Sequence, residues 1–279
     1  MDLYNRLELG DIRNVNEEEQ EKFFYQPIYQ ILPLEYAKSI LVNKEIRFNN
    51  VFISWEDPYE LFIFKQKTFI DGKSFSIDNY EKRIYGQCWS LNKDTDAMWR
   101  IYSPKKKGVR IRTTIGKMIQ VLDQTRGLMW TAPLFGLVKY VNQGDIITYL
   151  RDIEKGGTGK FFESVADSLF YKRTEFSHEK EMRFIIDIDP NQPHVENDHI
   201  NLKVNPSDFI EEIGLDPRLD ISEVNLITKD LLAINDSINI SQSDLYAFEP
   251  LEINLDNTPI HIVNALDKYH ERHNLLKGE

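Results

Sequence analysis

The segment EFSHEKEMRFIIDID (residues 175–189) combines two glutamates and an arginine with a strongly apolar run. At the period of two that governs a β-strand, Glu179, Glu181 and Arg183 share one face. The run FII (184–186) favours a strand and carries it into a core. A strand that begins with charge on one face enters its core from an edge or a cleft. Two interpretations follow: a solvated edge strand with a Glu–Arg pair, or a two-carboxylate site at the mouth of a sheet.

Composition places the chain among globular proteins. Of its 279 residues, 41% are hydrophobic and 12% are aromatic, which suffices for a sizeable core and excludes a disordered chain. The net charge is −11, so the chain as a whole is not a general nucleic-acid binder held by counterion release. Contact with nucleic acid would need a local basic patch, and the acidic surface suits a basic partner.

The sequence features that report on compartment agree with a cytoplasmic protein. Cys88 is the single cysteine, so an intrachain disulfide cannot form, as expected in a reducing cytosol. The acidic N-terminal segment lacks the apolar run of a signal peptide, and no segment approaches the roughly 20 apolar residues of a membrane helix. We therefore expect a cytoplasmic location and no membrane partner.

The order of predicted elements favours a single α+β domain. Strands and helices of differing length follow one another without internal repeats or a clear linker. We expect an N-terminal acidic arm (1–22), the domain itself (23–250) and a C-terminal helical tail (251–279). Two local predictions are a strand at RIYGQCWSL (83–91) and a flexible loop at GGTGK (156–160).

The predicted strand at 83–91 contains a thiol and a hydroxyl. Cys88 lies in its middle and is interpreted as a small buried side chain rather than a nucleophile. Ser90 lies at its end, where the hydroxyl either faces a cleft and binds a ligand or caps the next helix.

A short helix is predicted after this strand, with Asp94 or Thr95 as its N-cap. Trp99 and Tyr102 are three residues apart and share one face of that helix. The pair either packs in the core or forms an aromatic wall on which a flat ring stacks.

A basic turn follows the helix in an otherwise acidic chain. It contains Lys105, Lys106 and Lys107, with Arg110 and Arg112 close behind. The turn is either solvated or forms a patch that faces phosphate or nucleic acid.

Five motifs, in this order, resemble those of a large bacterial family. IRFNNVFISWEDPYE (46–60) resembles its F-N-D-P-F-E element, and CWSLNKDTDAMWRIYSPKKKGVRI (88–111) its C-F-S, M-W-S-H-Y-A and K-G-V-C-I elements. The family's V-x-Y element resembles VKY (138–140). Its next element, a K followed by W-x-x-E-x-E-x-R, resembles FYKRTEFSHEKEMRFI (170–185), and its closing segment resembles VNPSDFIEEIGLDPRL (204–219). The family is the bacterial domain-of-unknown-function family numbered twenty-nine seventy-one.

The resemblance covers residues 23–247 and departs from the family at definite places. FFYQPIYQIL (23–32), interpreted as a strand interrupted at Pro27, stands where the family has K-Y-R-S, so the arginine of that motif is missing. Arg100 stands in place of a serine, and Phe176 in place of the tryptophan.

The family is similar to the ADP-ribosyltransferase fold, which implies a mixed, mostly antiparallel split sheet flanked by helices. The implied activity is that of an NAD-dependent mono-ADP-ribosyltransferase that acts as a toxin or anti-phage defence effector. Its acceptor would be a nucleic acid, with RNA favoured, or a protein, and an antitoxin or chaperone is an expected partner. NAD is the substrate, and no metal is required.

The resemblance also implies roles for individual residues. Glu181 is the catalytic carboxylate that stabilises the oxocarbenium-like state as nicotinamide leaves, and Glu179 deprotonates or orients the acceptor. Arg183 holds one of these carboxylates or a neighbouring loop. The residues predicted to contact NAD are Tyr25, Gln26, Ser90, Trp99, Tyr102 and Arg183, and those predicted to contact nucleic acid are Lys105, Lys106 and Lys107.

Two other functions stay open at this point. One is a non-catalytic sensor or interaction module, in which the two glutamates form an edge-strand ion pair. The other is a nuclease that places Asp57, Glu60, Glu179 and Glu181 around Mg²⁺. A cleft that brings Glu181 together with Ser90 and Tyr25 would favour the transferase, and a wide separation of these residues would count against it.

Overall fold

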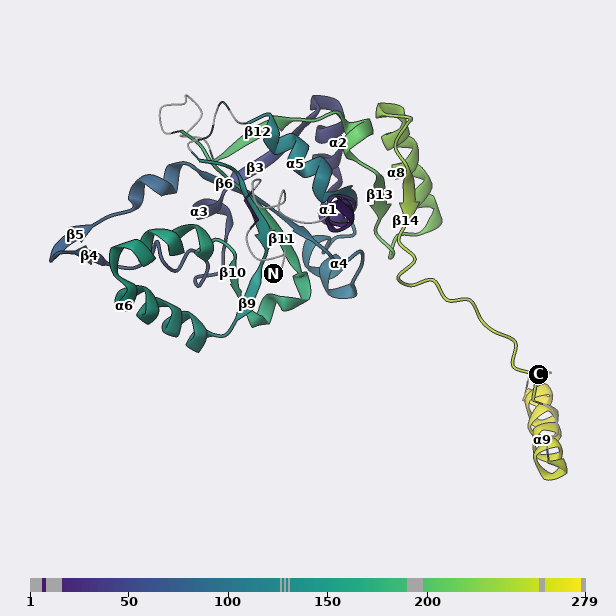
Figure 1. The fold of residues 1–279 in the computed structure, drawn as a ribbon. Coiled ribbons are helices and arrows are strands. Elements are labelled where there is room, and N and C mark those ends of the chain that lie inside the picture. Colours follow the sequence, from purple (N-terminus) through teal and green to yellow (C-terminus); the bar gives the residue numbers. More distant parts are fainter. Residues whose placement is uncertain are drawn as a thin grey trace. The chain divides into compact units, whose positions relative to one another are not determined.

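The computed structural model describes residues 7–8, 17–125, 127, 129, 131–189, 198–255 and 259–276. The chain forms two compact units, Met1–Leu245 and Tyr246–Glu279. The first unit holds the β-sheet, and the second contains the helix α9 (Ile260–Leu276) (Figure 1). None of the described helices is both long and apolar enough to cross a membrane.

A sheet of ten strands organises the first unit. Its main path runs in the order β1 (Leu7–Glu8), β8 (Leu134–Leu137), β11 (Glu181–Asp187), β6 (Ile84–Ser90), β2 (Pro27–Pro33), β7 (Gly108–Thr114), β13 (Glu212–Leu215) and β14 (Ile240–Gln242). Off this path, β3 (Glu45–Asn50) pairs with β6 and with β12 (His199–Lys203). Among the described pairs of this sheet, β13–β14 is parallel and the others are antiparallel, which confirms the predicted mixed, mostly antiparallel sheet.

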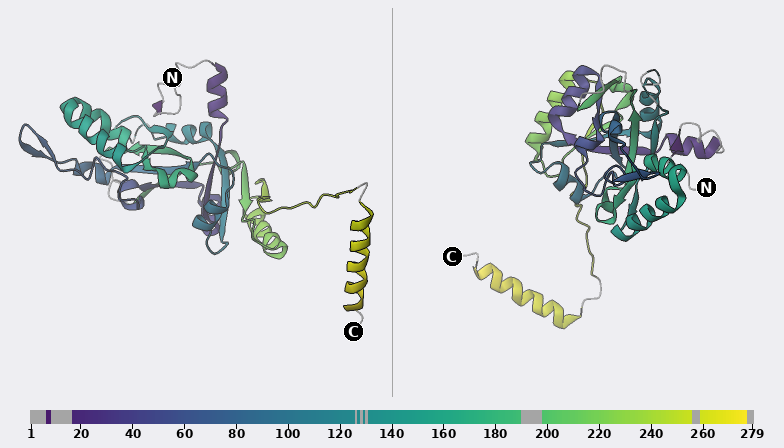
Figure 2. Two further views of the ribbon diagram at one scale, coloured as in Figure 1. Left: turned by 90° about the horizontal axis from the view of Figure 1, so that it is seen from below. Right: turned by 90° about the vertical axis from the view of Figure 1, so that its left-hand side faces the viewer.

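Two small sheets and the helices complete the unit. The strands β4 (Thr68–Ile70) and β5 (Lys73–Phe75) form a hairpin, and β9 (Lys139–Val141) pairs in parallel with β10 (Tyr171–Arg173). The helices are α1 (Glu17–Phe24), α2 (Leu34–Asn43), α3 (Val51–Ser54), α4 (Asp96–Tyr102), α5 (Ile115–Asp123), α6 (Gln143–Ser168), α7 (Pro206–Phe209) and α8 (Ile221–Ile234), with 3-10 turns η2 (Asp78–Lys82) and η3 (Thr174–Glu179). The hairpin and α6 lie at one end of the unit, and α2 and α8 lie at the other (Figures 1 and 2).

The sheet splits along β6, because two different strands share one of its edges. Tyr85 and Gly86 of β6 pair with β3, whereas Ser90 pairs with β2. Between these points side-chain amides replace the backbone ladder. The Gln30 amide donates to the Cys88 carbonyl at 2.9 Å, and the Gln87 amide donates to the Arg47 carbonyl at 2.7 Å. The two strands therefore diverge over the middle of β6.

Strand β11 is buried on both faces, and its period of two sorts its side chains. Phe184 and Ile186 point into the main core, where the rings of Phe135 and Phe184 stack. Ile185 faces the other way and packs in a smaller cluster. Glu181 and Arg183 share the face of Ile185, and the alternation places them outside the main core. Each fully buried apolar side chain stabilises the fold by about 1.5–3 kcal/mol.

Three local predictions were wrong. Glu179 is not on the strand, because η3 ends there, Lys180 takes a left-handed conformation with φ 43°, and β11 begins at Glu181. The segment GGTGK lies inside α6, which bends at Gly157 (φ 68°). Pro27 begins β2 instead of interrupting it, since the first residue of a strand can lack a ladder N–H.

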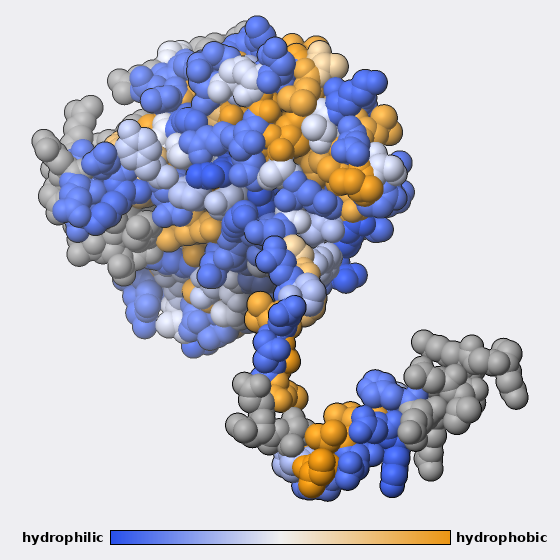
Figure 3. All heavy atoms as spheres, turned by 90° about the vertical axis from the view of Figure 1, so that its right-hand side faces the viewer, coloured by the Kyte–Doolittle hydropathy of each residue, from blue (hydrophilic) through white to orange (hydrophobic). Residues whose placement is uncertain are grey.

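Hydrophobic side chains also lie on the surface of the unit. The face shown in Figure 3 carries small groups of them among hydrophilic ones. Helix α8 exposes Ile221, Leu226, Leu232 and Ile234. Such scattered apolar residues are normal for a globular surface.

Candidate active site

A cavity of about 610 Å³ lies over the split of the sheet, which is within the range of roughly 300–1,000 Å³ for small-molecule sites. Strands β2, β3, β6, β10 and β11 contribute to its lining, together with α4 and η3. Five of the predicted site residues line it: Ser90, Tyr102, Glu179, Glu181 and Arg183. We call this cavity the split cleft.

Register places three polar side chains in one row across the floor of the split cleft. Glu181 on β11 is directly opposite Ser90 on β6, and Ser90 is opposite Tyr29 on β2. Directly opposite residues project their side chains to the same face of a sheet. The structure therefore brings Ser90 and Glu181 together as predicted.

The hydroxyl of Ser90 holds η3 against β6. It donates to the carbonyl of Glu179 at 2.6 Å and accepts from the N–H of Asn92 at 2.9 Å. Both contacts fix the backbone at the point where Glu179 enters the cleft. In this structure the serine therefore positions Glu179.

Lys172, on β10, joins the two glutamates. Its ammonium lies 2.5 Å from Oε2 of Glu179 and 2.5 Å from Oε1 of Glu181. The hydroxyl of Tyr102 donates to Oε1 of Glu179 at 2.8 Å. Two carboxylates that would repel each other are thus held side by side by one cation.

Arg183 holds the other oxygen of Glu181. Its Nε donates to Oε2 of Glu181 at 2.8 Å, and its Nη2 pairs with the carboxylate of Glu60. The ring of Trp55 lies 4.0 Å from the guanidinium, and the guanidinium also donates to the Leu169 carbonyl at 2.7 Å. Arg183 is fully buried, so the predicted role of holding a carboxylate matches its contacts.

These contacts separate the pKa values of the two glutamates. Burial opposes ionisation of Glu181, but Arg183 and Lys172 outweigh it and hold its pKa well below the usual range. Burial, followed by the hydrogen bond with Glu181, raises the pKa of Glu179. Burial also opposes the charge on Lys172, yet the attraction of Glu181 raises its pKa above the usual value. Glu181 is therefore the ionised carboxylate, and Glu179 takes up a proton first.

Two residues predicted for the early strand lie elsewhere, because β2 starts later than expected. Tyr25 precedes the strand and is 71% exposed, and the amide of Gln26 donates to the Pro27 carbonyl. Neither lines the split cleft, so the expected grouping of Glu181, Ser90 and Tyr25 is found for the first two residues and not for Tyr25. Instead, Tyr29 and Gln30 of β2 line the split cleft, where Tyr25 and Gln26 were predicted to lie.

The predicted aromatic wall is divided between core and cleft. Trp99 is fully buried beside Ile31 and Met98, and its indole N–H donates to Asp94. It is a core residue and does not line the split cleft, because this face of α4 packs against β2. Tyr102 lines the cleft through its contact with Glu179.

The basic turn lies outside the split cleft. Lys105, Lys106 and Lys107 are exposed and follow α4, and the Lys107 carbonyl accepts from the Leu34 N–H at 2.9 Å. Hydrogen bonds from Ser222 and from the Glu223 N–H lower the pKa of Asp220, the N-cap of α8, and the charge of Lys106 adds a smaller contribution. Nucleic-acid contact at this turn stays a prediction.

The carboxylates considered for Mg²⁺ are engaged by basic side chains. Asp57 accepts from Arg173 at 2.9 Å, and Glu60 pairs with Arg183. Within the described ranges, no group of three or more His, Cys, Asp or Glu side chains is arranged to hold a metal ion. Burial, reinforced by Glu181, raises the pKa of the Cys88 thiol, so it stays protonated at neutral pH.

Sequence reasoning missed the residues that complete the network. Lys172 is part of the quoted motif FYKRTEFSHEKEMRFI, but no role was assigned to it. Lys172 is seven residues before Glu179 and nine before Glu181. This spacing predicts an ion pair only once β10 and β11 are known to converge. The stacking of Trp55 on Arg183 and the register position of Tyr29 had no sequence pattern of their own.

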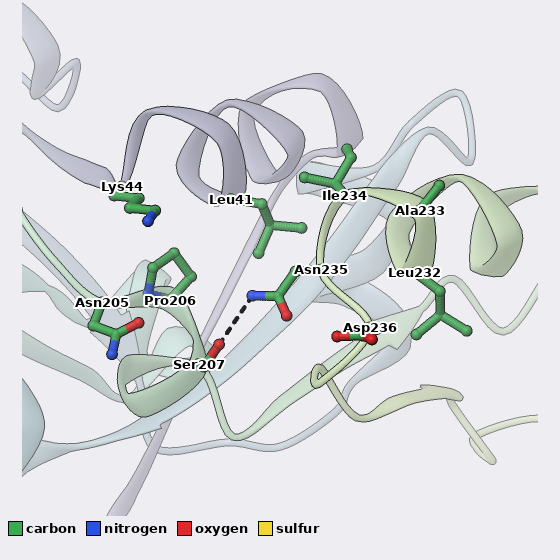
Figure 4. Close-up of a pocket in the computed structure, with 10 residues that line it drawn as sticks. All are labelled: Leu41, Lys44, Asn205, Pro206, Ser207, Leu232, Ala233, Ile234, Asn235 and Asp236. Carbon is green, nitrogen blue, oxygen red and sulfur yellow. Dashed lines mark hydrogen bonds between the residues drawn. The ribbon is translucent and has the colours of Figure 1, made fainter.

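A second cavity of about 360 Å³ lies at the ends of α2 and α8 (Figure 4). Its polar side chains are those of Lys44, Asn205, Ser207, Asn235 and Asp236, and the Asn235 amide donates to the Ser207 hydroxyl at 3.1 Å. It shares no lining residue with the split cleft. The split cleft is therefore the stronger candidate, because it holds the buried ionic network.

The model of a family described as "Protein of unknown function (DUF2971)" matches residues 98–184. This segment runs from α4 into β11 and includes Lys172, Glu179 and Glu181, so the resemblance stated from the motifs is confirmed over it. A search of the curated proteins finds no match.

Two solved structures to which the chain is similar are of Thermus sp. 2.9 DarT. The complex with NAD+ is 11% identical, with 80% of this chain and 98% of that chain covered and a TM-score of 0.36. The complex with ADP-ribosylated ssDNA is 12% identical, with 80% and 96% covered and a TM-score of 0.35.

Proposed function

We propose that this chain is an NAD-dependent mono-ADP-ribosyltransferase with Glu181 as its catalytic carboxylate. One observation carries the proposal. Glu181 lies opposite Ser90 in the floor of the split cleft and is held ionised by Lys172 and Arg183. The family resemblance adds the class of effector, a toxin or anti-phage protein.

The reaction needs a fixed negative charge next to a ribose. When the bond between nicotinamide and C1′ breaks, its electron pair leaves with nicotinamide and the ribose becomes oxocarbenium-like. A carboxylate has about four lone-pair positions, and Glu181 uses one oxygen for Lys172 and the other for Arg183. Positions remain to accept a ribose hydroxyl and to stabilise the developing positive charge.

Glu179 suits the acceptor step. The attacking atom of the acceptor donates its lone pair to C1′ and must lose its proton. A carboxylate with a raised pKa binds that proton better than an ordinary glutamate does, which is the requirement for a general base. Tyr102 and Lys172 keep Glu179 in place beside Glu181.

The two other functions fit these contacts less well. A purely structural ion pair would not require three buried carboxylates around two cations, because burying charge opposes folding by several kcal/mol per ion. A cluster of perturbed pKa values in a cleft is instead typical of a functional site. For a nuclease, Mg²⁺ would have to displace Lys172 and Arg183 from the carboxylates.

The proposal is tested by incubating the purified chain with NAD+ labelled in its adenylate part, together with single-stranded DNA, RNA or a protein mixture. The basic turn that favoured RNA does not line the split cleft, so all three acceptors are included. We expect nicotinamide release and label on one acceptor class, identified by nuclease or protease digestion. Absence of NAD+ consumption with every acceptor would reject the proposal.

Replacing Glu179 by glutamine is expected to lower transfer to the acceptor by roughly 100-fold, the lower end for loss of a general base. Hydrolysis of NAD+ by water should fall less, because Glu181 is retained. The measurement compares labelled acceptor with total nicotinamide release. Glu163→Gln, an exposed change on α6, is the control. Equal losses in both reactions would contradict the assignment of Glu179 to the acceptor.

A further inference from the structure

The lining of the split cleft is acidic, and most of its basic groups are already engaged. Its acidic side chains are Glu56, Asp57, Glu60, Glu175, Glu179 and Glu181, and its lysine and arginine side chains are Arg47, Lys172 and Arg183. Lys172 and Arg183 are held by glutamates at 2.8 Å or less. The pyrophosphate of a dinucleotide carries two negative charges, so this acidic lining would repel it unless a further cation contacted it.

Arg47 is placed to be that cation. It is exposed, it lines the split cleft, and no ion pair joins it to a carboxylate in the described part of the chain. Its guanidinium lies 5.6 Å from the centre of the Tyr36 ring, which orients it without neutralising it. Its backbone is fixed separately, because its N–H donates to the Tyr36 hydroxyl at 2.8 Å and its carbonyl accepts from Gln87.

We propose that Arg47 binds the pyrophosphate of the dinucleotide substrate. The inference rests on the proposed function and extends it by assigning the anion site. The cation comes from β3, on one side of the split.

The positions of Arg47 and Glu181 allow both residues to contact one dinucleotide. Arg47 shares its face of β3 with Asn49, which is opposite Gly86, and Glu181 is opposite Ser90 on that same face of β6. The two residues therefore face the same side of the sheet from opposite sides of β6, and because β3 has left the β6 ladder at Arg47, their backbones are more than two strand spacings, or roughly 10 Å, apart. In NAD+ the pyrophosphate is bonded to the 5′ oxygen of the nicotinamide ribose, and the long arginine side chain lines the cleft. The ribose can therefore meet Glu181 while the pyrophosphate meets the guanidinium.

The test measures ADP binding to the full chain by titration calorimetry and the KM for NAD+ by nicotinamide release. Arg47→Gln is expected to weaken ADP binding and raise KM by at least roughly tenfold, the effect of losing one charge-assisted contact. Arg47→Lys should recover part of this, because it keeps the charge without the bidentate fork. Inhibition by nicotinamide, which carries no phosphate, should not change.

The control is Arg112→Gln, on β7 outside the split cleft. Unchanged ADP affinity in Arg47→Gln, or no ADP binding by the unmodified chain, would overturn the proposal. If only binding of a single-stranded oligonucleotide is weakened, the anion is a nucleic-acid phosphate and the pyrophosphate assignment is overturned. If ADP binding depends on Arg47 but no NAD+ is consumed, the anion site stands and the transferase proposal fails.

Discussion

Glu181→Gln is expected to lower NAD+ turnover by roughly 100- to 1,000-fold, the usual effect of removing a group that stabilises transition-state charge. The amide keeps the size of the side chain, but it cannot balance the positive charge that develops on the ribose. Since the proposed role is exerted in the transition state, the loss should appear in kcat and leave the KM for NAD+ nearly unchanged. Nicotinamide release at saturating NAD+ is the measurement.

This substitution also removes a buried charge from an ionic network, so a fold control is needed. Asp187 lies at the other end of the same strand, is equally well buried and pairs with Arg83 at 2.7 Å. It does not line the split cleft. Asp187→Asn therefore makes the same chemical change in β11 and should keep full turnover. If Glu181→Gln is folded by thermal melting and still consumes NAD+ at the normal rate, Glu181 is not the catalytic carboxylate.

Arg183→Met is expected to lower the free energy of unfolding by about 3 to 5 kcal/mol, the range for removing one partner of a buried ion pair. Glu60 loses its basic partner, and Glu181 retains only Lys172. The indole of Trp55 also loses the cation that it covers. Urea unfolding followed by far-UV circular dichroism gives the change.

A double variant separates loss of charge balance from loss of packing. Because burial raises the pKa of Glu60, its neutral form is already the easier one to bury. Glu60→Gln combined with Arg183→Met should therefore recover part of the stability. Arg100→Met, which removes an exposed pair with Asp96 on α4, should change stability by less than about 1 kcal/mol. Equal effects of Arg183→Met and Arg100→Met would show that the buried network contributes no stability.

The capping of α4 shows how far local sequence reaches. The sequence predicted Asp94 or Thr95 as the N-cap, and the hydroxyl of Thr95 accepts from the Met98 N–H at 3.1 Å. Asp94 is used differently, because Arg110, the indole of Trp99 and the hydroxyl of Ser243 converge on it from other elements. Both residues can cap a helix, and only the long-range contacts decide which one does.

The sequence by itself determined the central strand and the face that Glu181 and Arg183 share, because a period of two is a property of the backbone. It also determined that the strand at 83–91 ends on Ser90. Tertiary structure alone decided that Glu179 reaches the same place from a 3-10 turn, that Lys172 joins the two glutamates, and that β2 presents Tyr29 instead of Tyr25. These contacts depend on strand register and on the convergence of β10 with β11. Both are set by burial of side chains far apart in the chain, which no local pattern records.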